Sequence, residues 1–559
     1  MHEECPKCGG RVNGRHCMDC GYGVTHQARI RQRLKDDSDI GVRQALAANV
    51  GAPWDLLRDL SKDPDPGVRA FVAASDVLLK SDYEVLSRDP AHEVRASVAG
   101  NRQAGFLVLE GLSSDKSPEV RRALAANPGI LVSQLEYERI MDESPFPTPR
   151  DDDTYFELSS QLSYKSILLV DELAQDADEG VRDALASQYV VLAADWRQPL
   201  SAVDLSDGGR RSPEDIARIL SKADPWRLDH LADEHEWLVD VAIAGMRNAE
   251  DSTLRKLFRY YDEGNGAADD GEVAAALAGN PCTPLSILER LTVEDSPYLT
   301  GTPSQLAANP SSPPSVLERM SRTGHGGLVA KNPAATYAVL DGLSADGDCW
   351  TRTAVAETPA IPPSILQRLS RDESVEVRCA VARNECVTPS VLESLAVDGD
   401  KEVRASVAGN PVASPAVIDA LAHDADSDVR RSAAASVRAA ESTLESLAND
   451  PDEYVRLAVA ANAATPVSVA AALSADASPE VRSAVAERKE LPHGAIRALA
   501  HDAVPAVRSA IVANPDISIP LDILEELSCD SDALVRRAIA GNPSAIADED
   551  EIKHRGVSF

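Results

Sequence analysis

The chain has few aromatic residues, no long apolar run and no general excess of positive charge. Phe, Trp and Tyr make up 4% of its 559 residues, so its core must consist of small side chains, as in a stack of short helices. No stretch approaches the roughly 18 consecutive apolar residues of a membrane-spanning helix, and the opening MHEECPKCGG lacks the apolar segment of a signal peptide. These absences predict a cytoplasmic protein with no membrane span and no secretory leader.

The charge balance is strongly acidic. The net charge is −34, from 56 Lys and Arg against 90 Asp and Glu. Nucleic acid repels such a polyanion except at a local basic patch. A patch of this kind is confined to residues 1–35, where seven basic and three acidic residues give a net charge of +4. We therefore expect nucleic-acid binding to be unlikely except through this basic N-terminal part.

A short motif recurs along most of the chain. The string VRASVAGN begins at Val94 and is repeated without change at Val403. Alignment on V-R-x-x-V-A-x-N gives 17 units, most of them 26 residues apart. The units begin at Val42, Val68, Val94, Val120, Val181, Val239, Val273, Thr302, His325, Thr351, Val377, Val403, Val429, Val455, Val481, Val507 and Val535. A fixed period of this length indicates a repeat array.

Each unit is expected to form two short helices. In the unit Thr388–Pro411, Leu392 and Leu395 fall on one face of a first helix. Val403 and Val407 lie four residues apart, which is helical spacing rather than the alternation of a strand. An Asn before Pro ends the second helix, because the residue preceding Pro disfavours the helical conformation. Neither helix can bury its apolar face alone, so the units must stack.

The consensus x-x-L-x-x-L-A-x-D-x-x-x-x-V-R-x-x-V-A-x-N-P resembles the leucine-rich repeat variant family. The resemblance covers residues 37–141 and 273–548 well and 155–272 poorly. It implies a right-handed superhelix of alternating α- and 3-10 helices. HEAT-like repeats share the Asp-to-Arg offset but normally have longer units. We therefore expect an all-α, right-handed α/3-10, HEAT-like solenoid of 17 repeats with a small metal-binding knuckle at its N-terminus.

The sequence divides into six segments. They are a four-cysteine head at 1–25, a basic linker helix at 26–36, regular repeats at 37–141, degenerate repeats with loops at 142–272, C-terminal repeats at 273–548 and a tail at 549–559.

Two charged positions recur within the units. Arg follows the first residue in 13 of the 17 units, and an Asp stands six residues before it. Examples are Arg95 with Asp89, Arg404 with Asp398 and Arg430 with Asp424. We interpret them as a structural ladder in which each Arg bonds an Asp of its own or the neighbouring repeat. The alternative is a row of exposed arginines that holds an anionic ligand. The recurrent Asn residues are interpreted as helix C-caps.

Four cysteines near the N-terminus have the spacing of a metal site. Cys5, Cys8, Cys17 and Cys20 form a C-x2-C-x8-C-x2-C pattern. Each C-x-x-C pair presents two thiolates to one metal, so the pattern is similar to a short zinc ribbon and predicts structural Zn²⁺. In the leucine-rich repeat variant family a small cysteine domain can carry a [4Fe–4S] cluster, which is the alternative cofactor that the resemblance implies.

The sequence favours a binding role over catalysis. No nucleophile–base arrangement, phosphate loop or carboxylate pair stands out, so we expect no enzymatic activity. Specificity in a regular array must come from places where the period breaks, which makes Trp196, Trp226 and Trp237 candidate partner-binding residues. We expect a protein-interaction scaffold. The alternatives are a nucleic-acid-associated adaptor that uses the basic head and an iron–sulfur redox sensor.

Overall fold

The computed structural model describes residues 26–127, 225–262, 270–292 and 302–547, with shorter pieces at 12–13, 16–17, 173, 176–178, 180–181, 212–220 and 223. The chain divides into two compact units. Unit 1 comprises Met1–Tyr189 together with Ala470–Phe559, and unit 2 comprises Val190–Val469. Both ends of the chain therefore belong to unit 1.

The protein is an all-α helical repeat solenoid in which each repeat has a first and a second helix. The first helices are α3 (Trp54–Leu60), α5 (Lys80–Leu86), α7 (Phe106–Leu112), α14 (Pro225–Leu231), α16 (Asp251–Asp262), α18 (Leu285–Arg290), α20 (Pro314–Ser321), α22 (Tyr337–Asp346), α24 (Pro363–Leu369), α26 (Pro389–Leu395), α28 (Pro415–Leu421), α30 (Glu441–Leu447), α32 (Val467–Leu473), α34 (His493–Ala500) and α36 (Leu521–Leu527). The second helices are α2 (Ile40–Ala48), α4 (Pro66–Ala73), α6 (His92–Gly100), α8 (Pro118–Ala125), α13 (Pro213–Leu220), α15 (Trp237–Gly245), α17 (Asp270–Gly279), α19 (Pro303–Ala308), α21 (Gly326–Lys331), α23 (Cys349–Ala356), α25 (Val375–Arg383), α27 (Lys401–Ala408), α29 (Ser427–Ala435), α31 (Glu453–Ala461), α33 (Pro479–Ala486), α35 (Pro505–Ala513) and α37 (Ala533–Gly541).

Four further elements flank the repeats. They are α1 (His26–Lys35), α38 (Pro543–Ile546) and the strands β1 (Val12–Asn13) and β2 (His16–Cys17), which pair antiparallel. None of the helices that the structure describes combines the length and the apolar character needed to cross a bilayer.

Local sequence explains where the helices begin and which side they bury. The side chain of Asp400 accepts a hydrogen bond from Glu402 N and so caps the second helix α27. Val403 and Val407, four residues apart, are fully buried on one face of this helix. First helices such as α26 begin with Pro, whose missing N–H would have no partner at that position. Each repeat therefore buries a stripe of Val, Leu and Ala against its neighbours.

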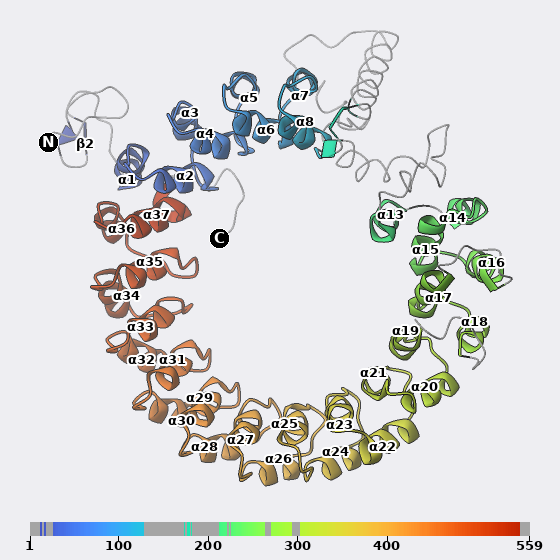
Figure 1. The fold of residues 1–559 in the computed structure, drawn as a ribbon. Helices are drawn as coiled ribbons and strands as arrows, with labels where there is room; N and C mark the ends of the chain where they lie inside the picture. Colours follow the sequence, from blue (N-terminus) through green and yellow to red (C-terminus); the bar gives the residue numbers. More distant parts are fainter. Residues whose placement is uncertain are drawn as a thin grey trace, which may run out of the picture. The chain divides into compact units, whose positions relative to one another are not determined.

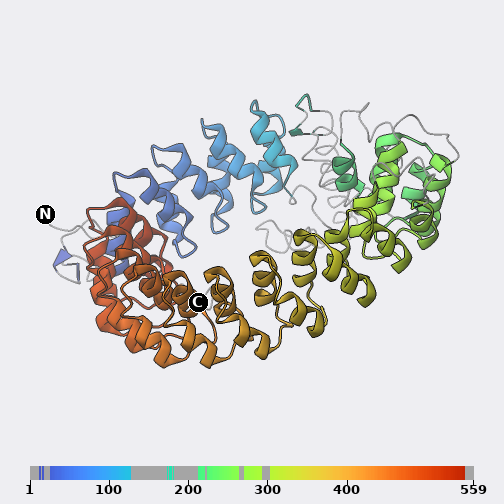
Figure 2. The ribbon, with the colours of Figure 1, turned by 60° about the horizontal axis from the view of Figure 1, so that its bottom comes forward.

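The helices form two layers within each unit. In unit 2 the second helices α19 to α31 line the inner side of the curve and the first helices α20 to α30 the outer side (Figure 1). The gold and orange repeats stand side by side in the turned view (Figure 2). The described part of the segment 142–272 contributes α13 to α16, and α13 packs on α15 as regular second helices pack on one another.

The structure corrects the expectation of 3-10 helices. Every helix among the described residues, including the short first helices, is an α-helix. In α3 the bonds run from Leu57 N to Pro53 O at 3.1 Å and from Ser61 N to Leu57 O at 2.8 Å, which is the i to i−4 pattern. The leucines at positions 56, 57 and 60 are all buried. The spacing of 3.6 residues per turn brings these three side chains onto one face, so the packing requires α geometry.

The helix α1, expected as a basic linker helix at 26–36, packs on other helices of unit 1. Ile30 and Leu34 are one turn apart and fully buried, and α1 packs on α36 and α38 in the C-terminal part of unit 1. Glu525 of α36 accepts a hydrogen bond from Arg29 Nη2 at 2.8 Å. The positive charge of α1 thus serves a contact between segments nearly 500 residues apart.

The first and last repeats of unit 1 also stack directly on each other. Helix α2 packs on α37. Arg536 donates from Nε to Asp37 Oδ2 at 2.6 Å and from Nη2 to Asp37 Oδ1 at 3.0 Å. Asn49 Nδ2 donates to Ala540 O at 2.7 Å. The second helices of the two terminal repeats therefore cover each other's apolar sides.

Candidate partner-binding surface

The recurrent arginines form a ladder that connects neighbouring repeats. Arg404 donates from Nε and Nη2 to the two carboxylate oxygens of Asp424 at 2.7 and 3.0 Å, and from Nη1 to the main-chain oxygen of Asp398 at 2.9 Å. Each Arg thus contacts the backbone of its own turn and the carboxylate of the next repeat. Further rungs are Arg43–Asp63, Arg69–Asp89, Arg95–Asp115, Arg121–Asp176, Arg352–Asp372, Arg378–Asp398, Arg430–Asp450, Arg482–Asp502, Arg508–Asp530 and Arg536–Asp37.

The charged groups of the ladder are largely buried and bonded to one another. The side chains of Arg404 and Asp424 are 19% and 11% exposed. The hydrogen bond from Arg404 lowers the pKa of Asp424 despite burial, and the same bond raises the pKa of Arg404. A planar guanidinium that donates to four oxygens, as that of Arg404 does, has few donors left for a ligand. The ladder therefore links neighbouring repeats, and most donors of its arginines are engaged by oxygens of the fold.

A second chain of polar contacts runs through the recurrent asparagines. Asn410 is 1% exposed. Its Nδ2 donates to Ala382 O at 2.6 Å and Asn384 O at 3.1 Å in the preceding repeat, and its Oδ1 accepts from Val412 N at 2.8 Å. The amide thereby satisfies carbonyls at the C-terminus of the preceding second helix. Several of these residues are C-caps as expected, but the amide also links two repeats.

The arginine ladder is interrupted in unit 2, whereas the asparagine contacts continue. The positions of the ladder arginine are held by Asp240, Ala274, Pro303 and Gly326. The amide nitrogens of Asn280, Asn309 and Asn332 still bond carbonyls of the preceding repeats. Hydrogen bonds from asparagine side chains to backbone carbonyls therefore still connect these repeats where the ladder arginine is absent.

Asp240 replaces a ladder arginine by a buried acid. Its carboxylate is fully buried and accepts a hydrogen bond from the hydroxyl of Tyr261 at 2.7 Å. The Nδ1 of His235 lies 3.8 Å from Asp240 Oδ2, and the imidazole stacks on Tyr260 with ring centroids 3.6 Å apart. Desolvation raises the pKa of Asp240 to about 7, and nearby Glu236 adds to this shift. One carboxylate oxygen, Oδ1, has no hydrogen-bond partner, so the neutral acid is the better fit.

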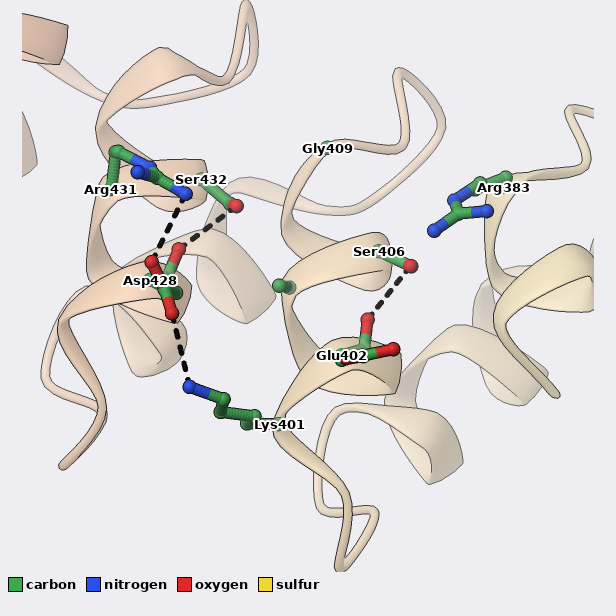
Figure 3. A pocket seen from close by; sticks show the side chains of 9 residues that line it. Arg383, Lys401, Glu402, Ser406, Gly409, Asp428, Arg431 and Ser432 are labelled. Carbon is green, nitrogen blue, oxygen red and sulfur yellow. Dashed lines mark hydrogen bonds and ion pairs between the residues drawn. The ribbon is translucent and has the colours of Figure 1, made fainter. Parts of the chain in front are cut away.

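A polar hollow lies on the inner side of unit 2 between α25, α27 and α29. Its volume is about 550 Å³, and small side chains from α27 form its floor (Figure 3). Asp428 is held by Lys401 Nζ at 3.1 Å and Arg431 Nη2 at 3.0 Å. Within the described part of unit 2, neither the Arg383 guanidinium nor the Glu402 carboxylate forms an ion pair. One cation and one anion of the hollow are thus available to a partner.

Two exposed aromatic residues flank this hollow. Trp350 on α23 is 80% exposed and Tyr454 on α31 is 58% exposed. Both stand just before the first buried residue of their second helices, as do Glu376, Glu402 and Asp428 on the three helices between them. These five residues are called the 350–454 row. With neighbouring helices about 8–10 Å apart, the row extends over roughly 40 Å.

The structure places the residues expected from the sequence as follows. Trp196 and the side chains of Cys5, Cys8, Cys17 and Cys20 lie outside the described residues. Trp226 on α14 is 64% exposed. Trp237 begins α15 and is half-buried, with an Nε1 that lacks a hydrogen-bond partner. Sequence reasoning sought aromatic residues where the period breaks and so passed over Trp350 in a regular repeat. An alignment of the residues that directly precede the first position of each unit would have revealed Trp350.

Comparison with known proteins agrees with the type of repeat. The family model described as leucine rich repeat variant matches residues 479–504, the span of one repeat. No curated protein matches the chain.

Among solved structures, one described as a leucine-rich repeat variant with a novel repetitive protein structural motif is 27% identical, covering 40% of this chain and 87% of that chain with a TM-score of 0.30. Importin beta in an ammonium sulfate condition is 14% identical over 95% of this chain and 70% of its own, with a TM-score of 0.27. UNC-45 from Drosophila melanogaster is 13% identical, covering 98% of this chain and 74% of that chain, with a TM-score of 0.21.

Proposed function

We propose that this protein is a non-enzymatic protein-interaction scaffold and that the second-helix face of unit 2, from α23 to α31, is its docking surface. The observation that carries the proposal is the pair of exposed aromatics at equivalent positions, Trp350 and Tyr454, on either side of the polar hollow. Aromatic anchors beside polar groups are typical of protein-binding sites. The ladder and the asparagines cannot play this part, because their polar atoms bind neighbouring repeats.

We expect Trp350→Ala and Tyr454→Ala to weaken partner binding by about 10-fold or more each, as loss of a hot-spot aromatic does. The partner is first recovered by affinity purification from the native host, and binding is then measured by titration calorimetry.

The chain offers matched controls for both substitutions. Trp226 is 64% and Tyr337 56% exposed, and both lie on first helices. Trp226→Ala and Tyr337→Ala should leave the affinity within about 3-fold of wild type, as is typical of residues outside an interface. If Trp226→Ala abolishes binding while Trp350→Ala does not, the docking surface lies instead in the section 142–272 with Trp196, Trp226 and Trp237.

We further propose that Cys5, Cys8, Cys17 and Cys20 hold one structural Zn²⁺, with a [4Fe–4S] cluster as the alternative. The pairing of Val12 with Cys17 in a β-hairpin supports the proposal, because it folds the segment between the two cysteine pairs back on itself. Four thiolates close a tetrahedral site and leave no open position for catalysis.

Metal analysis should find about one zinc per chain, a count that falls in Cys8→Ser because structural sites need all four ligands. The far-ultraviolet circular dichroism should stay unchanged, since the repeats have their own core. A broad visible absorption band in anaerobically purified protein would instead indicate an iron–sulfur cluster held by the four cysteines and favour the redox-sensor alternative.

The nucleic-acid alternative depends on the basic residues of the N-terminal part. In the structure Arg29 bonds Glu525, Arg31 donates to Ile546 O at 2.7 Å, and Lys35 pairs with Asp59 at 2.9 Å. These contacts compete with phosphate for the same donors, which is why we rank the adaptor role below the protein scaffold.

A further inference from the structure

Where second helices stack, long side chains are accommodated by glycine in the next repeat. A Cβ on Gly180 would come within 2.5 Å of Arg122 Nε, and one on Gly67 within 2.5 Å of Gln44 Nε2. In both cases the long residue is two positions after the first buried valine of its helix, and the glycine is the residue just before that valine in the following repeat. The glycine leaves room for the long side chain to cross to the next repeat.

Arginines at this position behave differently when the following glycine is absent. Arg122 reaches across Gly180 and pairs with Asp178 at 3.0 Å. For Arg431 the corresponding position of the following repeat is Tyr454 instead of glycine. Arg431 pairs with Asp428 of its own helix at 3.0 Å. A crossing arginine and a glycine therefore form a size-matched pair.

The junction between the two ends of the chain contains the same pair. Gly41 lies against Arg537 in the way that Gly180 lies against Arg122. Arg537 Nη2 reaches Asp39 Oδ1 at 3.3 Å. Together with the rung from Arg536 and the hydrogen bond from the Asn49 side-chain amide to Ala540 O, this contact repeats the main polar contacts of an interface between consecutive repeats. The two end faces are thus size- and charge-complementary.

We infer that these end faces form an interchangeable interface, so that the C-terminal face of one chain (α36 to α38) fits the N-terminal face (α1 and α2) of a second copy. The contact depends on the faces of the repeats and not on a covalent connection between them, because residues 37 and 536 are joined only through 498 intervening residues. Within one chain the two faces are at high effective concentration, so the wild type pairs its own ends. Chains whose own ends cannot pair should exchange them.

The occupant must match the apolar and the polar parts of each face. Val42 and Val535 are fully buried at the junction, so separated ends would expose apolar surface that only another repeat of this kind can cover. Glu525 adds specificity, since it binds Arg29 and, through its main-chain oxygen, Arg33 Nη1 at 3.3 Å. A second copy supplies all these groups in the same register.

Two full-length variants with reversed charges test this inference. The N-reversed chain carries Arg29→Glu and Asp37→Arg and keeps a wild-type C-terminal face. The C-reversed chain carries Glu525→Lys and Arg536→Asp and keeps a wild-type N-terminal face. Neither variant can pair its own ends or associate with itself without like-charge contacts. A mixture contains two matched pairs of faces, the two wild-type faces and the two reversed faces, so two chains can close on each other. A third chain with all four substitutions restores both ion pairs within one molecule.

Light scattering after size exclusion should give the mass of one chain for each reversed variant alone, and the mass of two chains for their equimolar mixture. The chain with four substitutions should remain a single chain. Hydrogen exchange of α2 and α37 should be faster than wild type in each reversed variant and slow again in the mixture. A mixture that stays monomeric overturns the inference, as does unchanged exchange in the reversed variants, because the named contacts would then not hold the ends. Circular dichroism reports whether each variant retains its helices.

Discussion

Replacing Arg404 by alanine should destabilise the repeats around α27 by about 2–3 kcal/mol. The substitution removes four hydrogen bonds, two to Asp424 and one each to the main-chain oxygens of Asp398 and Gly399. It also leaves Asp424 as a carboxylate that is 11% exposed and has lost its guanidinium partner, and an uncompensated buried charge is destabilising. Native-state hydrogen exchange of α27 and α29 measures this loss locally, which matters because long repeat arrays do not unfold in one step.

Arg383 provides the control in the neighbouring repeat. It is exposed at the end of α25 and has no ion pair within the described part of unit 2. Arg383→Ala should change the same local stability by no more than about 0.5 kcal/mol. Equal effects of the two substitutions would mean that the ladder contributes little and that its arginines are available for another role.

Asp240→Asn should stabilise the α15–α16 region most strongly at alkaline pH. The folded-state pKa of Asp240 is raised from 3.8 to about 7, so the folded state binds more protons than the unfolded state between these values. Stability from this group therefore falls as the pH rises from 4 to 7 and stays low above that, with a total loss of about 4 kcal/mol. Asparagine has the same shape, can accept the Tyr261 hydroxyl and does not ionise.

The measurement is the difference in local unfolding free energy between Asp240→Asn and wild type, by hydrogen exchange at pH 5 to 8. The advantage of the variant should grow by about 2–3 kcal/mol over this range. Ladder carboxylates such as Asp424 do not contribute, because their lowered pKa values keep them ionised above pH 5. Asp229→Asn is the control, since the hydrogen bond from Lys256 lowers the pKa of Asp229 and its difference from wild type should not vary with pH. A flat difference for Asp240→Asn would show that the acid is not desolvated.

The sequence by itself determined the repeat and its two helices. Buried positions such as Val403 and Val407, the Pro starts of first helices and the recurrent polar residues are local signals, because helix periodicity and capping depend on residues within a few positions of one another. The motif that combines these signals recurs in 17 units, some of them incomplete, which makes the all-α solenoid predictable without a structure. The helix type was not readable, because short stretches of leucines fit both α- and 3-10 helices until packing selects one.

Only the tertiary structure decided which residues are partners. An Asp stands six residues before Arg404 and another stands 20 residues after it, and these offsets differ by one 26-residue period. A periodic sequence is unchanged by a shift of one period, so it cannot tell the Asp of the same repeat from that of the next. The structure assigns the main-chain oxygen of Asp398 and the carboxylate of Asp424 to the same arginine. The same ambiguity hid the pairing of Arg536 with Asp37, because a rung between the last and the first repeat has the same local sequence as a rung between neighbours and depends only on the two faces meeting in space.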